Sequence, residues 1–242
     1  MISVCLLSYN GAKYIEAQLS SILTQLDHDD EVIISDDGST DGTLDIIKDY
    51  GDRRIKLCQN HQKVTSYKGT MKMCYNVGRN AENALNKALG DYIFLADQDD
   101  IWLPGKVETC LKELQFKDLV ITNHIPVDSQ LIPLNNIYKP SRIKTPSLLN
   151  TLTHTQFLGC CMAFKKKLLP YILPFPSEPV MHDIWIGLMA IKYGKISLIQ
   201  EPYLLYRRHG NNASVNIEKH SINPISFKLM YRFYLLRAYL KR

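Results

Sequence analysis

The stretch Tyr92-Ile93-Phe94-Leu95-Ala96-Asp97-Gln98-Asp99-Asp100 passes directly from an apolar run to three carboxylates. Such a run is typical of a buried strand in a parallel sheet, and open α/β sheets bind ligands at the carboxyl ends of their strands. Asp97 and Asp99 could present oxygens to one hard divalent ion. The segment could instead be an acidic turn that caps the following helix. Three acids this close repel one another unless a cation or hydrogen bonds compensate them.

A second acidic segment follows another apolar run, at Val32-Ile33-Ile34-Ser35-Asp36-Asp37-Gly38-Ser39. A carboxylate at this position could accept a hydrogen bond from a pyrimidine imide or a ribose hydroxyl, and Gly38 permits a tight turn. Taken alone, the segment favours a strand-to-helix turn that binds no ligand, with Ser39, Thr40 or Asp41 as the helix cap.

Short apolar runs alternate with helical patterns from residue 2 to about residue 123, which predicts an α/β fold with a mostly parallel sheet. The expected strands are residues 2–8, 32–36, 55–58, 92–96 and 119–123. Two helical faces should pack on this sheet, formed by Leu19, Ile22, Leu23 and Leu26 and by Ala81, Ala84, Leu85 and Ala88. Residues 61–77 read as a long polar loop.

Composition narrows the class of protein. A chain of 242 residues with 45% hydrophobic and 22% charged residues fits one large globular domain. The net charge of +5 is spread too evenly for a nucleic-acid-binding stripe. The six cysteines form no CxxC pair, which favours reduced thiols and the cytoplasm. The N-terminus reads as a strand and not as a signal peptide, and no apolar stretch reaches the roughly 18 residues that span a bilayer.

The order of four motifs resembles family 2 of the glycosyltransferases over nearly the whole chain. These are Ser8-Tyr9-Asn10, Asp36-Asp37-Gly38-Ser39, Arg79-Asn80 and Asp97-Gln98-Asp99-Asp100. The resemblance implies the GT-A fold, in which a Rossmann-like, mostly parallel sheet is flanked by helices and followed by a region on the acceptor side. The form Asp-Gln-Asp-Asp is most similar to the rhamnosyltransferase-type branch.

The resemblance also implies the substrates and the site. The donor is a nucleotide-diphosphate sugar, the acceptor a saccharide or a lipid-linked saccharide, and the cofactor a divalent Mn²⁺ or Mg²⁺ ion. Asp36 and Asp37 inherit contacts with the base and ribose, with Tyr9 as a candidate for stacking on the base. The implied donor-binding residues are Ser8, Tyr9, Asn10, Asp36, Asp37, Arg79, Asn80, Asp97, Gln98, Arg207 and Arg208, and the implied metal ligands are Asp97, Asp99 and His209.

A general base is expected in Met181-His182-Asp183-Ile184-Trp185, at the start of a helix. Family resemblance carries this role to Asp183, because direct displacement at an anomeric carbon requires removal of the acceptor hydroxyl proton. The local sequence alone favours a helix N-cap for Asp183. His182 could bind substrate or be structural, and Gly159 would permit close approach of a sugar.

The segment Tyr206-Arg207-Arg208-His209-Gly210-Asn211-Asn212 resembles the closing segment of the family. His209 could complete the coordination of a metal ion, and an arginine could bind phosphate oxygens. A basic surface loop is the alternative.

The expected organisation is a GT-A domain over residues 1–220 and a helical extension over residues 221–242. Within the domain, residues 1–123 would bind the nucleotide sugar and residues 124–220 would shape the acceptor side. The extension could contact a membrane surface, pack on the domain or join a second copy in a homodimer. Inverting transfer in the synthesis of a bacterial surface polysaccharide, with peripheral contact to the plasma membrane, is the setting that the resemblance implies.

Two other classes of protein remain open. The alternating pattern also suits a nucleotidyltransferase or a dehydrogenase, although no GxGxxG follows the first strand. A non-catalytic sugar-nucleotide-binding protein is the other alternative, and the joint presence of Asp97, Asp99 and Asp183 argues against it. The donor sugar could also be another hexose, from UDP-galactose or UDP-glucose.

Overall fold

The computed structural model describes residues 1–61, 64–134, 146–153, 157–209 and 224–242. Eight strands form one sheet in the order β3-β2-β1-β4-β7-β6-β8-β5. The strands are β1 Ile2–Ser8, β2 Glu31–Asp36, β3 Ile55–Gln59, β4 Tyr92–Asp97, β5 Ile101–Trp102, β6 Leu119–Val127, β7 Met162–Lys165 and β8 Ile196–Arg207. All five expected strands are confirmed, and the α/β fold with them.

The sheet is mostly parallel, with two exceptions. β7 runs antiparallel between β4 and β6, and β5 runs antiparallel to β8 at the edge. Strand β7 lies in the apolar run that follows Phe157, after a short 3-10 helix at Gly159–Cys161. It pairs with β4 and with residues 119–121 of β6, so the second expected half contributes a strand to the sheet of the first half, and residue 123 falls inside β6.

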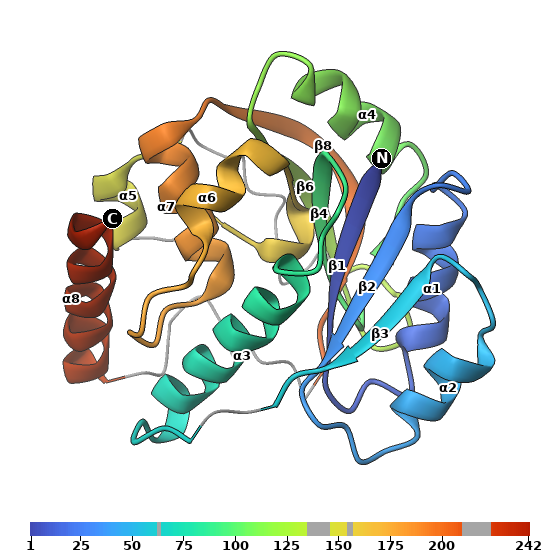
Figure 1. Ribbon diagram of the computed structural model, residues 1–242, viewed down its shortest axis with the longest axis horizontal. Coiled ribbons are helices and arrows are strands. Elements are labelled where there is room, and N and C mark those ends of the chain that lie inside the picture. The colour runs from blue at the N-terminus through green and yellow to red at the C-terminus, as the bar shows by residue number, and fades with distance from the viewer. Residues whose placement is uncertain (62–63, 135–145, 154–156, 210–223) are drawn as a thin grey trace.

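Helices cover the sheet, and several helices lie to one side of it (Figure 1). The helices are α1 Ile15–Leu23, α2 Thr43–Asp49, α3 Gly69–Leu85, α4 Lys106–Leu114, α5 Leu148–Thr153, α6 Leu169–Ile172, α7 His182–Tyr193 and α8 Ile225–Lys241. α3 packs on β1 and β2, whereas α4 packs near β6, β7 and β8. At the other side of the molecule from α2, α8 lies against α5 and α7 (Figure 1).

The core forms where the sequence pattern predicted it. Every residue of β2 is buried, as are Val4, Cys5 and Leu6 of β1. The two predicted helical faces are also buried, although Leu26 and Ala88 lie just beyond the ends of their helices. Burial of these apolar faces between helices and sheet is the main stabilising term of the fold.

The polar loop predicted for residues 61–77 is wrong in its second part. Helix α3 begins at Gly69 and runs for 17 residues, and it buries Met71, Cys74 and Gly78. Between Met71 and Leu85 its buried residues are small or polar, because it packs closely on the sheet and on the segment around Val180. A pattern search for large apolar residues therefore detects only the last turns of this helix.

The C-terminal extension is helical, as expected, from Ile225 to Lys241. Its expected start at residue 221 and the domain end at residue 220 lie outside the described residues. Among the helices that the structure describes, none is long and apolar enough to cross a membrane.

Candidate active site

The candidate site lies at the carboxyl ends of three adjacent strands. Ser8, Asp36 and Asp97 are the last residues of β1, β2 and β4, and β1 is the central strand of the three. In the register of the sheet Ser8 is opposite Asp36, and Leu7 is opposite Asp97. The sheet therefore brings three of the predicted motifs to one edge, as the parallel topology requires.

Asp36 organises the loop after β2. Its fully buried carboxylate accepts hydrogen bonds from the Ser8 hydroxyl, from the Ser39 hydroxyl at 2.6 Å and from the backbone N–H groups of Gly38 and Ser39 at 3.0 and 2.8 Å. Gly38 has a φ of 89°, a backbone conformation that favours glycine. Both oxygens of Asp36 are thus engaged inside the protein, where they shape the loop after β2.

Asp37 and Tyr9 are less buried than Asp36 and Ser8, the strand-end residues that precede them. Asp37 is half-buried and accepts a hydrogen bond from the Asn60 side-chain amide at 2.7 Å, while Tyr9 is 55% exposed. An exposed aromatic ring beside a carboxylate is suited to stacking on a base and accepting its N–H hydrogen bond.

Asn10 and Gln98 hold these loops together. Asn10, with a φ of 51°, accepts a hydrogen bond from the Thr40 N–H and donates its own N–H to the Ser39 hydroxyl, both at 2.8 Å. The Gln98 amide accepts the Tyr9 N–H at 2.7 Å and donates to the Tyr9 carbonyl at 2.8 Å. Both side chains that were predicted to bind the donor are therefore occupied in positioning the loop that carries Tyr9.

The three acids after β4 have very different partners. An oxygen of Asp99 lies 2.9 Å from Nε2 of His209, and Oδ1 of Asp100 accepts the backbone N–H of Arg207 at 3.0 Å. The other oxygen of Asp100 is buried and has no hydrogen-bond partner among the described residues. Asp99 and His209, two of the predicted metal ligands, thus meet across 110 residues of sequence.

Burial makes Asp97 and Asp100 resist ionisation. It raises the pKa of Asp97 to about 7, with further contributions from the carboxylates of Asp99 and Asp183. The pKa of Asp100 is raised well above its ordinary value, again mainly by burial and next by Asp99. Carboxyl groups gathered in this way favour a bound cation, because a cation removes both the desolvation cost and the mutual repulsion.

The donor set fits a divalent ion. Ligand atoms of Asp97, Asp100 and Cys160 lie within 4.8 Å of one another, which puts Asp100 and not Asp99 in the tightest group of ligand atoms. However, the Cys160 thiol is buried and its pKa is raised well above the usual range, which disfavours the thiolate that binds metals. Carboxylate and imidazole ligands suit Mn²⁺ or Mg²⁺ better than a thiol, and of the predicted ligands Asp97, Asp99 and His209 the structure shows Asp99 and His209 in contact.

The end of β8 closes the site from the far half of the chain. The Arg207 guanidinium donates to the carbonyl oxygens of Asp99 at 2.7 Å and Ser129 at 2.8 Å. The Arg208 guanidinium donates to the Tyr206 hydroxyl at 3.3 Å. Arg207 thus holds the acidic turn, and the remainder of the predicted closing segment, Gly210 to Asn212, lies outside the described residues.

Tyr14 is a site residue that the sequence did not suggest. Its ring stacks on His209 with centroids 4.9 Å apart, and the guanidinium carbon of Arg207 lies 4.6 Å from the ring centroid. Tyr14 therefore supports the two residues that approach Asp99. An aromatic residue at the start of a helix carries no signal of this role, because its partners lie nearly 200 residues away.

Asp183 reaches the site from α7. It lies in the first turn of the helix, whose N-cap is Met181, so the N-cap alternative is wrong. Its Oδ1 accepts the N–H of Ile184 at 2.7 Å. Burial raises the pKa of Asp183 to about 6, and Asp183 in turn raises the pKa of Asp97. His182, the residue before Asp183, lies against Gly159, and the thiol of Cys160 lies within 4.8 Å of the carboxylates of Asp97 and Asp100, so the start of α7 is close to the acidic cluster.

The position of the His182 ring explains why residue 159 is a glycine. A β-carbon on Gly159 would lie 2.5 Å from Nε2 of His182, so glycine is needed to make room for the imidazole and not for a sugar. Burial lowers the pKa of His182 to about 4, which keeps the ring neutral. Its Nδ1 is buried without a hydrogen-bond partner among the described residues.

Arg79 and Asn80 do not join the acidic cluster. Arg79 donates to Glu82 and to the carbonyl oxygen of Pro176, both at 2.6 Å, and Asn80 accepts a hydrogen bond from the Ser35 hydroxyl at 2.6 Å. These contacts favour a structural role, in which α3 is tied to the acceptor-side segment and to β2, over the predicted contact with the donor.

Lys106 is a second residue missed by sequence reasoning. It is fully buried, donates to the carbonyl oxygen of Cys160 at 2.6 Å and lies 4.5 Å from the centroid of the Trp102 ring. A buried ammonium group fixes the turn that carries Cys160 beside the acids. Nothing in its sequence position, in the first turn of an amphipathic helix, distinguishes it from a surface lysine.

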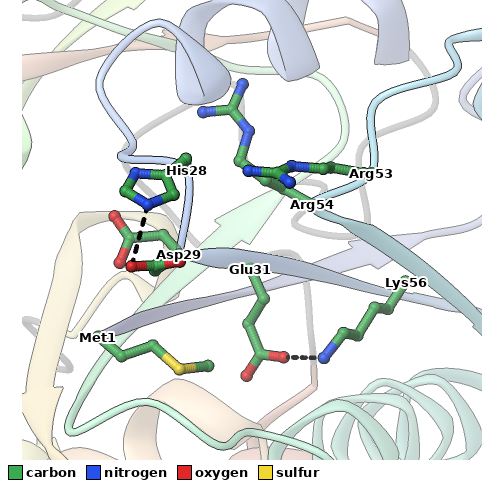
Figure 2. A pocket seen from close by; sticks show the side chains of 8 residues that line it. Met1, His28, Asp29, Glu31, Arg53, Arg54 and Lys56 are labelled. Atoms are coloured by element: carbon green, nitrogen blue, oxygen red, sulfur yellow. Dashed lines mark hydrogen bonds and ion pairs between the residues drawn. The ribbon is translucent and has the colours of Figure 1, made fainter.

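A shallow cavity of about 290 Å³ lies at the opposite edge of the sheet, where β1, β2 and β3 begin (Figure 2). Within it Glu31 pairs with Lys56 at 2.7 Å and His28 with Asp29 at 3.2 Å. Arg54 donates to the carbonyl oxygens of Leu23 and Leu26. Since these charged groups compensate one another, the cavity does not compete with the acidic edge as a candidate site.

Comparison with known proteins places the chain in a family. Residues 3–171 match glycosyl transferase family 2. The dTDP-rhamnosyl transferase RfbG of Shigella flexneri is 30% identical over 93% of this chain and 76% of its own length. The chain spans 66% to 81% of the length of the first three curated relatives that it matches.

Two solved structures share the fold. TarS 1-349 of S. aureus in complex with UDP-GlcNAc has a TM-score of 0.68 at 19% identity, over 98% of this chain and 65% of that one. The mannosyltransferase PcManGT from Pyrobaculum calidifontis, in complex with GDP-Man and Mn²⁺, has a TM-score of 0.58 at 18% identity, over 88% and 58% of the two chains. At these identities the likeness shows the GT-A fold alone.

Proposed function

The chain belongs to glycosyl transferase family 2, and from this premise we propose that it transfers a sugar from a nucleoside-diphosphate sugar to an acceptor hydroxyl with inversion. One observation carries the proposal. The start of α7, which carries Asp183 of the acceptor-side half, lies against the Gly159–Cys161 turn, and the thiol of Cys160 lies within 4.8 Å of a carboxylate oxygen of Asp97 in the nucleotide-binding half. The proposed base and a group proposed to bind the donor are therefore close to each other.

Asp183 is the proposed general base. As the acceptor oxygen attacks the anomeric carbon, the hydroxyl proton passes to Asp183 and the bond from the sugar to the diphosphate breaks. Because Oδ1 accepts the Ile184 N–H, Oδ2 is the oxygen that would take the proton. A pKa of about 6 leaves the group ionised at neutral pH yet more basic than an exposed aspartate. A single displacement inverts the anomeric configuration.

Asp97, Asp99 and His209 would hold the divalent ion. When bound, Mn²⁺ or Mg²⁺ would neutralise charge on the diphosphate leaving group. Arg207 keeps the acidic turn in place through the Asp99 carbonyl, and Tyr14 supports His209. Arg208, whose side chain lies on Tyr206, is the second cation proposed to face the phosphates.

Rhamnose from dTDP-rhamnose is the proposed donor sugar, supported by the similarity to RfbG. UDP-glucose and UDP-galactose are the alternatives. Asp37 and Tyr9 are proposed to bind the base and ribose, because Tyr9 is exposed and Asp37 is only partly buried, whereas both oxygens of Asp36 are engaged inside the protein. The proposed acceptor is a saccharide carried on a lipid, in the synthesis of a bacterial surface polysaccharide.

The test measures nucleoside-diphosphate release from dTDP-rhamnose, UDP-glucose, UDP-galactose, UDP-N-acetylhexosamines and GDP-mannose, with and without Mn²⁺ or Mg²⁺. We expect metal-dependent release from one donor. Asp183→Asn should lower that rate by about 10²–10⁴-fold, while the donor still raises the melting temperature. Release by the variant at the wild-type rate would refute the base assignment. Donor binding without release, with acceptors supplied, would favour a binding protein.

A further inference from the structure

The C-terminal helix α8 presents an apolar stripe to solvent. Ile225, Leu229, Phe233, Leu236 and Leu240 are spaced by three or four residues, so they fall on one face of the helix. Their exposed fractions lie between 37% and 75%. In Figure 1 α8 forms an outer edge of the molecule, where α5 and α7 cover its other side.

The opposite face of α8 is firmly anchored. Leu235 and Ala238 are buried, the Tyr231 hydroxyl accepts the Met181 N–H at 3.0 Å, and Arg232 donates to the carbonyl oxygen of Leu152 at 2.6 Å. A helix with apolar residues on both faces shows little amphipathic pattern in sequence. Only the tertiary packing shows which apolar face is buried against the domain and which is exposed to solvent.

Charge is concentrated on this helix. Residues 225–242 hold five basic residues and no acidic one, so the other 224 residues balance at 24 basic and 24 acidic. The whole net charge of +5 therefore lies on α8 and Arg242. At 100° per residue, Lys228 and Arg232 lie on one side of the stripe, and Arg237 and Lys241 on the other.

One neighbouring acid reduces this charge without removing it. Glu178 pairs with Arg237 at 3.4 Å and Lys241 at 3.3 Å. The side chains of both bases remain about half exposed. The hydrogen bonds from Arg232 and Arg242 go to backbone carbonyl oxygens, which leave the guanidinium charge in place.

We propose that the apolar stripe of α8 docks on an anionic lipid surface, with its flanking basic residues at the headgroups. An apolar stripe between two basic margins matches the boundary between acyl chains and anionic headgroups. A second copy fits less well, since α8 has no acidic residue and two such helices would oppose like charges. The partner is therefore the bilayer.

Docking would also orient the catalytic half. Tyr231 of α8 holds the N–H of Met181, two residues before Asp183, so the lipid-facing helix is directly bonded to the start of α7. A lipid-carried acceptor would then reach Asp183 from the membrane on which the enzyme rests. This consequence rests on the proposed function, whereas the lipid binding itself does not.

Co-sedimentation of the full chain with vesicles tests the proposal. We expect binding to phosphatidylcholine vesicles that contain phosphatidylglycerol, weaker binding to phosphatidylcholine alone, and loss of binding as salt screens the charges. The combined variant Leu229→Ser, Phe233→Ser and Leu240→Ser should lower the partition by roughly tenfold or more. Because these side chains are exposed, the melting temperature and circular dichroism should match the wild type.

Phe116→Ser is the matched control, since Phe116 is 81% exposed and lies just after α4, away from α8. It should leave vesicle binding unchanged. Equal sedimentation of the wild type and the α8 variant, or no sedimentation of the wild type with anionic vesicles, would overturn the proposal. A dimer in light scattering that the α8 variant breaks, without vesicle binding, would assign the stripe to a second copy. Nucleotide release in vesicle-free solution tests the proposed function separately.

Discussion

The loops after β2 and β4 begin alike and end differently. Each follows a buried strand next to β1 and each starts with an aspartate on the last strand residue. In the first loop Asp36 receives hydrogen bonds from two hydroxyls and two backbone N–H groups. In the second, one oxygen of buried Asp100 has no partner among the described residues, and burial raises the pKa of Asp97 to about 7.

The number of internal hydrogen-bond donors decides the role of a carboxylate at a strand end. Hydrogen bonds compensate the buried charge of Asp36 inside the protein, so this residue builds the loop. The acids after β4 are gathered without enough internal donors, so the folded protein holds a destabilised cluster that a cation would relieve. Of these two similar motifs, one shapes the site and the other is proposed to bind a cation.

Asp99→Asn would test this contrast most strongly. We expect the transfer rate to fall by about 10²–10³-fold, because the variant weakens the proposed metal set and the contact with His209. Calorimetric titration with Mn²⁺ should show weaker binding, and urea unfolding should show little loss of stability. A variant that binds Mn²⁺ as the wild type does would remove Asp99 from the metal ligands.

Asp36→Asn should act on stability instead. An amide cannot accept all the hydrogen bonds that the carboxylate receives, so we expect unfolding to become easier by about 2–3 kcal/mol, measured in urea. Asp37→Asn is the matched control at a half-buried neighbour with one side-chain donor, Asn60. It should change stability by less than about 1 kcal/mol while weakening donor binding. The opposite ranking would mean that Asp37, and not Asp36, holds the loop.

The pH dependence of kcat/KM tests the role of Asp183 as the base. Its pKa is raised to about 6, so the ionised base is lost as pH falls through that value. Below it, kcat/KM should fall about tenfold for each pH unit. Initial rates from pH 5 to 8 at saturating metal would show this limb, and an Asp183→Asn variant should lack it. A wild-type rate that is flat down to pH 5 would contradict a base with this pKa.

Asp100→Asn should cause a small change in stability, and in the opposite direction to the change caused by Asp36→Asn. The pKa of Asp100 is raised well above its usual range, so ionising this group disfavours the folded state as pH rises. The amide removes that cost and keeps an oxygen for the Arg207 N–H, so the metal-free protein at pH 8 should be unchanged or more stable by about 1 kcal/mol. Thermal melting without and with Mn²⁺ measures this. A large loss of stability would mean that the Asp100 charge is compensated after all.

The sequence by itself determined five of the eight strands that the structure describes, the parallel half of the sheet and the motifs at its carboxyl edge. This succeeded because burial on both faces of a strand leaves an apolar run, and a helix packed on a sheet leaves a 3.6-residue period. Family resemblance added Asp183 and His209, whose roles no local pattern could supply.

Tertiary structure decided which of those residues meet. Gln98 and Asn10 form hydrogen bonds that position the loop of Tyr9. The His182 ring packs against Gly159. Arg79 and Asn80 form contacts away from the acids. Tertiary structure also brought in Tyr14 and Lys106 and separated the two faces of α8. The physical reason is that periodicity records burial of a residue, whereas a hydrogen-bond partner or a stacked ring is fixed only when distant segments pack together.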